Sequence, residues 1–301
     1  MNRLLGLVAI LPACVTAVDT SERDQSIVGG QSANIADYPT VVALENSPGN
    51  WYCTGTLIAP EWILTAAHCV EGERAADNMI RFDDQDINDT SGGLVVAVAE
   101  IHANPGYDGI AWDNDVALIK LATPVTDRAP TPVHRPVVAT ATTVIEVGDG
   151  DADDNGGGAG VLRKLNTPTI DCATTQEPGV SGDNILCFDA SDGNASCYGD
   201  SGGPAFVDLG GGSYAVAGIT SGGTQDSCIQ GWDLYTSVAG ELAYIDQVVS
   251  GLDPAPDPDP TPDPDPDPNP KDDDDGGCST GGSGGGLLLV GFALLLQRRR
   301  R

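Results

Sequence analysis

The sequence predicts an all-β protein that carries one helix at the end of its folded part. Short runs of β-branched and apolar residues recur between residues 27 and 250, and clusters of Gly, Pro, Asn and Asp separate them. Runs this short, divided by turn residues, are typical of an antiparallel barrel or sandwich. Residues 242–252 differ, because their apolar side chains recur at helical spacing. We therefore expect a barrel or sandwich that ends in a helix.

The N-terminal residues are predicted to direct export. A charged start at Arg3 precedes a short apolar stretch, and small residues follow near Ala17. This is the form of a secretory signal peptide, which we assign to residues 1–17. Cys14 offers lipid attachment as an alternative. Export would place the chain in an oxidising compartment, where cysteines can pair.

The segments that follow differ in character. Residues 18–26 are short and polar and are assigned as a propeptide. The expected strands after them include the runs TVVALE, GTLIA, WILTAA, LVVAVAEI, DVALIKL and YAVAGIT. The stretch GDGDADDNGGGAG, which begins at Gly148, is expected to be a flexible acidic loop.

The composition changes abruptly near the C-terminal end. Residues 251–277 are rich in Asp and Pro, cannot bury a core, and are expected to form a disordered, extended stalk. Residues 278–301 combine a cysteine, glycines, an apolar run at 287–296 and four arginines. That run is about half as long as a membrane-spanning helix needs. We expect a sorting signal with transient membrane contact, and a short permanent anchor is the alternative.

The chain is strongly acidic. Its 14 Lys and Arg face 44 Asp and Glu, which gives a formal net charge of −30. A chain of this charge does not bind nucleic acid or anionic membranes through general electrostatics. We therefore expect no nucleic-acid partner, and we interpret the charge as a solvated surface that keeps an exported protein soluble.

Three stretches carry the residue types of nucleophilic catalysis. TAAHC contains His68, DNDVALIKL contains Asp115 and GDSGGP contains Ser201. A serine nucleophile needs a base, a group that orients this base, and donors for the oxyanion. Glycines around a serine let backbone N–H groups approach a substrate carbonyl closely. Each residue alone is compatible with a structural role, but together, in this order, they predict a catalytic triad.

No metal or cofactor is expected. The other histidines are His102 and His134, which support no multi-histidine site. The carboxylates of the stretch RFDDQDINDTSGG lack the spacing of a calcium loop.

Residues 27–250 resemble the trypsin and chymotrypsin family of serine endopeptidases. The motifs IVGG, TAAHC, DVALIKL, GDSGGP and YTSV carry this resemblance. It implies two six-stranded antiparallel β-barrels with the active site between them. It also implies that His68 is the general base, Asp115 orients it and Ser201 is the nucleophile. The N–H groups of Gly199 and Ser201 would form the oxyanion hole.

The resemblance also selects a disulfide pairing. Six cysteines remain when Cys14 and Cys278 are set aside, and their spacing alone allows many pairings. The positions of the family imply the pairs Cys53–Cys69, Cys172–Cys187 and Cys197–Cys228.

The motif IVGG implies activation by cleavage before Ile27. The new amine of Ile27 would turn inward and pair with Asp200, so that an activating protease is an expected partner. Such a pair decides between two loop conformations, because either charge alone is costly to bury. Ser26 precedes the bond where trypsin-like precursors usually carry Arg or Lys, so we do not expect self-activation.

The expected primary pocket departs from that of trypsins. Ala195 occupies the position of their pocket aspartate, whereas Asp233 falls where a glycine commonly lines the pocket. A carboxylate at that place would bind a basic side chain, because a partly dry pocket strengthens charge pairing. In the alternative, Asp233 faces solvent, and Ala195 and Ser196 form a neutral pocket for apolar side chains.

Other positions would shape the cleft. Trp112 would crowd the neighbouring subsite, and Gly222 would open the outer subsites. Ser221 is expected to support Asp115, and Gly223 to pair with the substrate backbone.

The predicted function is that of a secreted or surface-displayed serine endopeptidase, which hydrolyses protein or peptide substrates through an acyl-enzyme. The tail resembles the C-terminal sorting signals of some Gram-negative bacteria, of the cysteine-bearing myxobacterial type or the Gly-Gly type. This implies a sorting protease as a partner and a position at the outer cell surface. The alternative function is an inactive protease-like binding module, an adhesin on a stalk. Retention of His, Asp and Ser in their motifs favours the enzyme.

Overall fold

The structure is a computed structural model that describes residues 27–109, 112–180 and 183–252. The signal peptide, the propeptide, most of the stalk and the sorting signal were predicted for residues that lie outside this part. Among the described residues, no helix is both long enough and apolar enough to cross a membrane.

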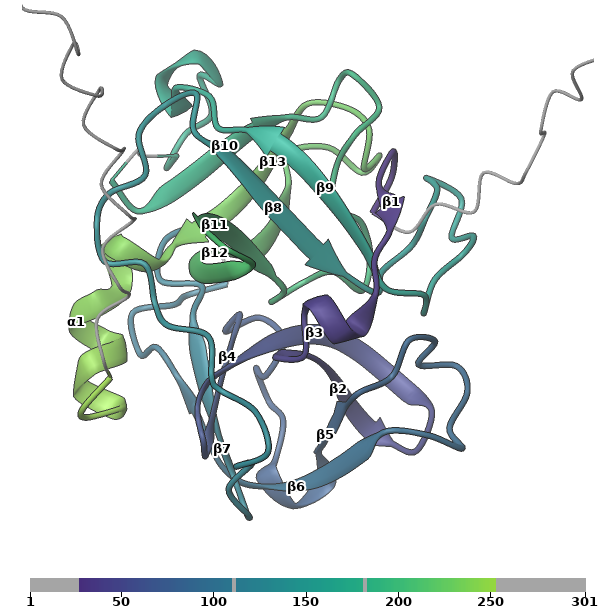
Figure 1. Ribbon diagram of the computed structural model, residues 1–301. Coiled ribbons are helices and arrows are strands. Elements are labelled where there is room, and N and C mark those ends of the chain that lie inside the picture. Colours follow the sequence, from purple (N-terminus) through teal and green to yellow (C-terminus); the bar gives the residue numbers. More distant parts are fainter. Residues whose placement is uncertain (1–26, 110–111, 181–182, 253–301) are drawn as a thin grey trace, which may run out of the picture. The chain divides into compact units, whose positions relative to one another are not determined.

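Six strands form a closed antiparallel barrel in the N-terminal half, in the order β2-β3-β4-β7-β6-β5. Figure 1 shows this barrel in the lower half of the view. Its strands are β2 (Val41–Ser47), β3 (Asn50–Ala59), β4 (Trp62–Thr65), β5 (Met79–Phe82), β6 (Leu94–Ala103) and β7 (Ala117–Leu121). Two short 3-10 helices belong to the same half, η1 (Ile35–Asp37) and η2 (Ala75–Asp77).

The inside of this barrel is filled by aliphatic side chains from all around it. Leu57, Ile63 and Leu118 are fully buried there. Burial of one such side chain contributes about 1.5–3 kcal/mol. A buried ion pair joins β5 to β2, because Nε and Nη2 of Arg81 donate to the two carboxylate oxygens of Glu45 at 2.7 and 3.2 Å. The barrel is therefore a rigid support for the loops that leave its strands.

Seven strands form the second sheet, in the order β1-β9-β8-β11-β12-β13-β10. These are β1 (Gln31–Ser32), β8 (Thr143–Gly148), β9 (Arg163–Pro168), β10 (Ile185–Asp189), β11 (Pro204–Gly210), β12 (Ser213–Gly223) and β13 (Trp232–Ser237). The 3-10 helix η3 (Cys172–Thr174) precedes β10.

This second sheet is a half-barrel. The N-terminal arm adds β1 to the edge of β9, while β9 and β10 approach each other only through the bridge between Ile170 and Cys187. The predicted all-β fold with a C-terminal helix is confirmed. Of the two six-stranded barrels expected, the first is a closed six-stranded barrel, and the second is a seven-stranded half-barrel.

Helix α1 (Val238–Val248) follows β13 without a loop, so it begins four residues before the predicted segment. Glu241 is buried and accepts a hydrogen bond of 2.9 Å from Nδ2 of Asn104. The hydroxyl of Tyr244 donates to the carbonyl of His102 at 2.8 Å. The helix therefore continues from the second sheet but is held by the loops and strands of the barrel.

Three disulfides have the predicted pairing, Cys53–Cys69, Cys172–Cys187 and Cys197–Cys228. Each closes a loop and contributes about 2–4 kcal/mol to stability. The first fixes the residue after His68 to β3, and the third joins two segments that line a pocket. Three disulfides also fit a protein that resides outside the cell.

Candidate active site

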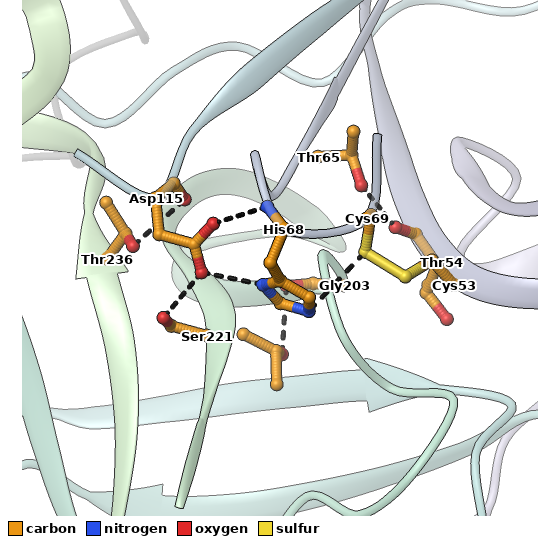
Figure 2. Close-up of polar contacts among 10 residues, drawn as sticks. Cys53, Thr54, Thr65, His68, Cys69, Asp115, Gly203, Ser221 and Thr236 are labelled. Carbon is orange, nitrogen blue, oxygen red and sulfur yellow. Dashed lines mark hydrogen bonds and ion pairs between the residues drawn. A yellow bond between two sulfur atoms is a disulfide. The ribbon is translucent and has the colours of Figure 1, made fainter. Parts of the chain in front are cut away.

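His68 and Asp115 come from two loops of the barrel, one after β4 and one before β7. Figure 2 shows the imidazole between the Asp115 carboxylate and the Cys53–Cys69 disulfide. Nδ1 of His68 lies 2.7 Å from Oδ2 of Asp115, and the His68 N–H donates to Oδ1 at 2.9 Å. These two contacts fix the orientation of the ring. They also leave Nε2 as the nitrogen that can exchange a proton with a substrate-side group.

The second sheet completes the environment of Asp115, whose side chain is 2% exposed. The hydroxyl of Ser221, on β12, donates to Oδ2 at 2.6 Å. The hydroxyl of Thr236, on β13, donates to the Asp115 backbone carbonyl at 3.1 Å. The carboxylate is thus buried with its charge satisfied by hydrogen bonds, which is the condition for a stable buried charge.

Ser201 lies in the turn before β11, where the second sheet meets the barrel. Its carbonyl accepts a hydrogen bond of 2.8 Å from the N–H of Thr54 on β3. A side chain at Gly202 would lie 2.1 Å from Oγ1 of Thr65, so this turn packs directly on the end of β4. His68 follows Thr65 by three residues. The turn therefore brings the serine to the loop that carries the imidazole.

The direct hydrogen bond between Ser201 and His68 is not formed in the described part of the chain. Instead, Nε2 of His68 lies 3.7 Å from Sγ of Cys69. Hydrogen bonds between catalytic groups are often long in free enzymes and shorten when substrate binds.

The backbone of the same turn offers two N–H groups. The N–H groups of Asp200, Gly202 and Gly203 donate to backbone carbonyls at 2.8–3.0 Å. Those of Gly199 and Ser201 have no hydrogen-bond acceptor among the described residues. Gly199 adopts φ +99°, which disfavours a side chain. Two unengaged donors in one turn are the feature that an oxyanion site requires.

A pocket of about 310 Å³ opens beside Ser201. The described residues that line it are Ser196, Cys197, Tyr198, Ser201, Thr220, Ser221, Gly222, Gly223, Gln225, Asp226, Cys228 and Asp233. Ala195, predicted to line the pocket, is not among these residues; it is 2% exposed, and its N–H donates to the carbonyl of Val28 in the N-terminal arm at 3.1 Å. Trp112 packs against Gly222, where an added Cβ would lie 3.2 Å from the indole ring.

Asp233 lies in the wall of this pocket and is 3% exposed. Its two carboxylate oxygens accept hydrogen bonds of 2.9 Å from the hydroxyl and the backbone N–H of Ser196. Burial raises the pKa of Asp233 to about 7, although the bonds to Ser196 oppose this shift. Near pH 7 the pocket therefore holds a carboxyl group that is partly protonated and partly charged.

Asp200, the residue before the serine, is also fully buried. Its carboxylate oxygens accept hydrogen bonds from the N–H groups of Gly150 at 2.7 Å and Cys197 at 2.9 Å. Burial raises the pKa of Asp200 to about 7, and no ion pair joins it to a described residue. Ile27 is 1% exposed, and the arm that follows it docks through Val28 onto Ala195. The arm is thus held against the segment that leads to Asp200.

Comparison with known proteins agrees with this geometry. A family model described as Trypsin matches residues 27–245. The chain belongs to the trypsin family. It is 34% identical over 236 residues to brachyurin from Leptuca pugilator, which covers 76% of this chain and 100% of that protein. It is 27% identical over 265 residues to chymotrypsin-like elastase family member 1 from Bos taurus, covering 83% and 99%. It is 34% identical over 206 residues to trypsin from Saccharopolyspora erythraea, covering 65% and 86%.

Membership of the trypsin family makes this chain a serine endopeptidase, a hydrolase whose substrates are proteins. One group of potential metal ligands lies at its site, since donor atoms of Cys53, His68 and Cys69 are all within 4.8 Å of one another. The two sulfur atoms form a disulfide, so no thiolate is available to bind an ion. This group therefore does not fit a metal site.

The sequence did not reveal the structural roles of two acidic residues of this trypsin-family protease, Asp154 and Glu146. Asp154 lies in the acidic loop after β8 and accepts hydrogen bonds from the N–H of Cys228 at 2.6 Å and the hydroxyl of Ser227 at 2.8 Å. The loop thereby holds one wall of the pocket, whereas we had expected only flexibility. Glu146 is buried in the interior of the second sheet. The signal for it in the sequence is a single acid within the apolar run TVIEVG.

Proposed function

We propose that this trypsin-family protease is exported, is activated by cleavage before Ile27, and cleaves its substrates after basic side chains. The observation that carries the proposal is the His68–Asp115 pair, which lies beside a turn with a serine, two unengaged N–H groups and an acidic pocket. Each part has a defined task in peptide-bond hydrolysis.

The reaction would begin with attack of Ser201 Oγ on the carbonyl carbon of the substrate. Nε2 of His68 takes the hydroxyl proton, and the Asp115 carboxylate stabilises the imidazolium that forms. The N–H groups of Gly199 and Ser201 donate to the oxyanion. His68 then gives its proton to the leaving amine, which produces an acyl-enzyme. A water molecule, deprotonated by His68, hydrolyses this ester and restores the serine.

Replacement of the nucleophile tests the activity. Ser201→Ala, in protein cut before Ile27, should lower kcat to the residual level left by binding and the oxyanion donors alone, a loss of about 10⁶-fold, with unchanged folding. The wild-type protein should react covalently with a fluorophosphonate probe and the variant should not. A folded wild-type protein that fails to react would instead support the binding-only module.

The pocket supports a preference for Lys or Arg next to the bond that is cut. Asp233 is the buried acid in its wall, and solvent reaches only 3% of the residue, whereas the other lining acid, Asp226, is exposed. An ion pair in such a place is stronger than one on the surface. Ser196 holds the carboxylate in position. Trp112 and Gly222 flank the next part of the cleft, consistent with a restricted neighbouring subsite and open outer subsites.

Activation by cleavage is supported by the surroundings of Asp200. The buried carboxyl accepts two N–H groups but has no cationic partner among the described residues. A free amine at Ile27 would supply that cation. Its charge would favour ionised Asp200 and so fix the turn that carries Gly199 and Ser201.

Export and display are supported by the disulfides and by the ends of the sequence. A signal peptide at 1–17, a stalk at 251–277 and a sorting signal at 278–301 would carry the protease to the outer surface of a Gram-negative cell. A second protease would remove the apolar segment of this tail. The four terminal arginines would keep to the cytoplasmic side before that cleavage.

A further inference from the structure

The inner face of β8 carries an acid where an apolar residue would be expected. Val144, two residues before Glu146, belongs to a buried cluster with Ala205 and Tyr235. Glu146 lies directly opposite Ala205 in the register of β8 and β11. Side chains two residues apart on a strand share one face. Glu146 therefore points into the same interior, and it is 1% exposed.

Gly148 is the next residue of β8 on this face, and it packs against Asp200 of the active-site turn. A Cβ at Gly148 would lie 2.2 Å from Oδ1 of Asp200. On the other side of the interior, β13 carries Tyr235 and, two residues earlier on the same face, Asp233 of the pocket wall. Glu146 thus lies behind the pocket, between the apolar cluster and two buried aspartates.

The charged and titratable groups around this interior are mostly acidic. Asp233 and Tyr235 face it from β13, and Asp200 faces it from the turn before β11. On β9, Leu165 lies opposite Glu146. Arg163, two residues from Leu165 on the same strand, lies opposite Gly148. No ion pair between described residues involves Glu146, Asp200 or Asp233.

Neither carboxyl oxygen of Glu146 has a hydrogen bond of ordinary geometry to a described residue, although the Tyr235 hydroxyl is close enough to oppose the rise in its pKa. Burial and the nearby charge of Asp233 raise the pKa of Glu146 well above its usual range. A buried polar group without a partner costs stability. Positions where a sequence breaks a packing rule at a cost in stability are often functional sites.

We propose that Glu146 and Asp233 form a buried acid pair that makes the primary specificity of the protease depend on pH. This inference rests on the proposed function, in which Asp233 binds basic side chains. Two carboxyl groups in one water-poor interior hinder each other's ionisation, so they lose their protons as a coupled pair. A Lys or Arg side chain that enters the pocket supplies the missing cation. Its binding releases a proton from the pair to solvent, whereas binding of an apolar side chain does not.

The direction of the pH effect follows from the raised pKa of Asp233, about 7. Below this pH the pocket acid is neutral and accepts uncharged side chains. Above it, the acid is charged and favours basic ones. The ratio of kcat/KM for an Arg substrate to that for a matched Leu substrate should therefore rise with pH. Titration of the catalytic groups affects both substrates alike and cancels in this ratio.

The test measures this ratio between about pH 5.5 and about pH 8.5 in protein cut before Ile27. The wild-type ratio should rise about tenfold or more, because each pH unit below the pKa changes the charged fraction about tenfold. Asp233→Asn should give a flat ratio. Glu146→Gln, which keeps the shape and removes the second acid, should leave this midpoint near the wild-type value, because Glu146 has the higher pKa of the two and is still protonated when Asp233 ionises.

A matched control is Asp189→Asn, which removes an exposed acid from β10, the strand next to β13. Solvent screens this charge, so the midpoint should stay where the wild type has it. A flat wild-type ratio would overturn the proposal. Equal proton release with and without Glu146→Gln in the calorimetric measurement described next would remove Glu146 from the pair and overturn the proposal equally.

A binding measurement separates this proposal from the proposed function. Benzamidine is a cationic aromatic probe whose binding needs no catalysis, so it is titrated calorimetrically into Ser201→Ala protein at pH 7, in buffers of different ionisation enthalpy. The pair predicts release of a substantial fraction of one proton on binding, and less release in the additional Glu146→Gln background. Protein that cleaves nothing but shows this release would refute the proposed function alone. Active protein that binds benzamidine without release would refute the acid pair alone.

Discussion

Ser221 contributes one hydroxyl to the site, and its effect can be isolated. It donates to Oδ2 of Asp115, the same oxygen that faces Nδ1 of His68. Ser221→Ala should lower kcat/KM about tenfold to a hundredfold, because a hydrogen bond to a charged group contributes about 1.5–3 kcal/mol. Steady-state kinetics on a peptide substrate measure the loss.

The matched control for Ser221 is Thr236→Val. Thr236 bonds the backbone carbonyl of Asp115 rather than its carboxylate, so this isosteric change should affect stability more than catalysis. A larger loss of kcat/KM in Thr236→Val than in Ser221→Ala would contradict the assignment.

The sequence offered single residues as candidates where a motif surrounds them. TAAHC, DVALIKL and GDSGGP were enough to choose His68, Asp115 and Ser201 as candidates, because each motif fixes the local turn and its chemistry together. Glu146 has no such motif. Its importance arises from the strands on either side of it and from Asp233, which lies 87 positions further along the chain. Periodicity in one strand does not reveal which acids meet in the interior.

At the scale of elements, the turn before β11 depends on glycines that tolerate no side chain. A Cβ at Gly199 would lie 2.5 Å from the Trp51 ring and 3.0 Å from Cα of Gly150, and φ is +99°. Gly199→Ala should displace one oxyanion donor and lower kcat about 10²- to 10³-fold. Activity and the unfolding midpoint are measured together.

The hairpin between β11 and β12 provides the comparison for this glycine. Gly212 also has a positive φ, +81°, but nothing lies within 4 Å of its added Cβ. Gly212→Ala should therefore cost some stability through backbone strain and leave activity intact. Equal activity in both variants would argue against the role of the Gly199 N–H.

The elements themselves were predicted to different degrees. The short β runs were correct, because turn residues are local signals. The disulfide pairing was also correct, but it came from the resemblance to the family, because the spacing of the cysteines allowed many pairings. The start of α1 was placed too late, since Val238 follows β13 without the turn residues that usually separate a strand from a helix. The seventh strand of the second sheet, β1, has two residues and is too short for a sequence pattern to reveal.

Across the whole molecule, the buried acids predict how stability depends on pH. Burial raises the pKa of Asp200 and Asp233 to about 7 and that of Glu146 and Asp149 well above its usual range. Groups with a raised pKa contribute stability that is full below their ordinary acidic pKa and is lost as pH rises through the folded value. The uncut protein should therefore unfold at lower temperature at pH 8 than at pH 5.

Cleavage before Ile27 should change this profile. The new amine would pair with Asp200, so cut protein should lose less stability between pH 5 and pH 8 than uncut protein, by on the order of a few kcal/mol. Calorimetric scans of both forms measure the difference. Asp200→Asn should abolish most of it, and a difference of the same size in that variant would contradict the pairing.

The attachment of α1 has a mechanical consequence. The contacts that hold this helix are arranged in order from its C-terminal end, first Asp246 with Arg135, then Tyr244 with His102, then Glu241 with Asn104. A force applied beyond residue 252 would have to break them one after another before it reached β13. A protease tethered by its C-terminus would thus carry load on its last helix, while His68, Asp115 and Ser201 stayed unstrained under flow or friction.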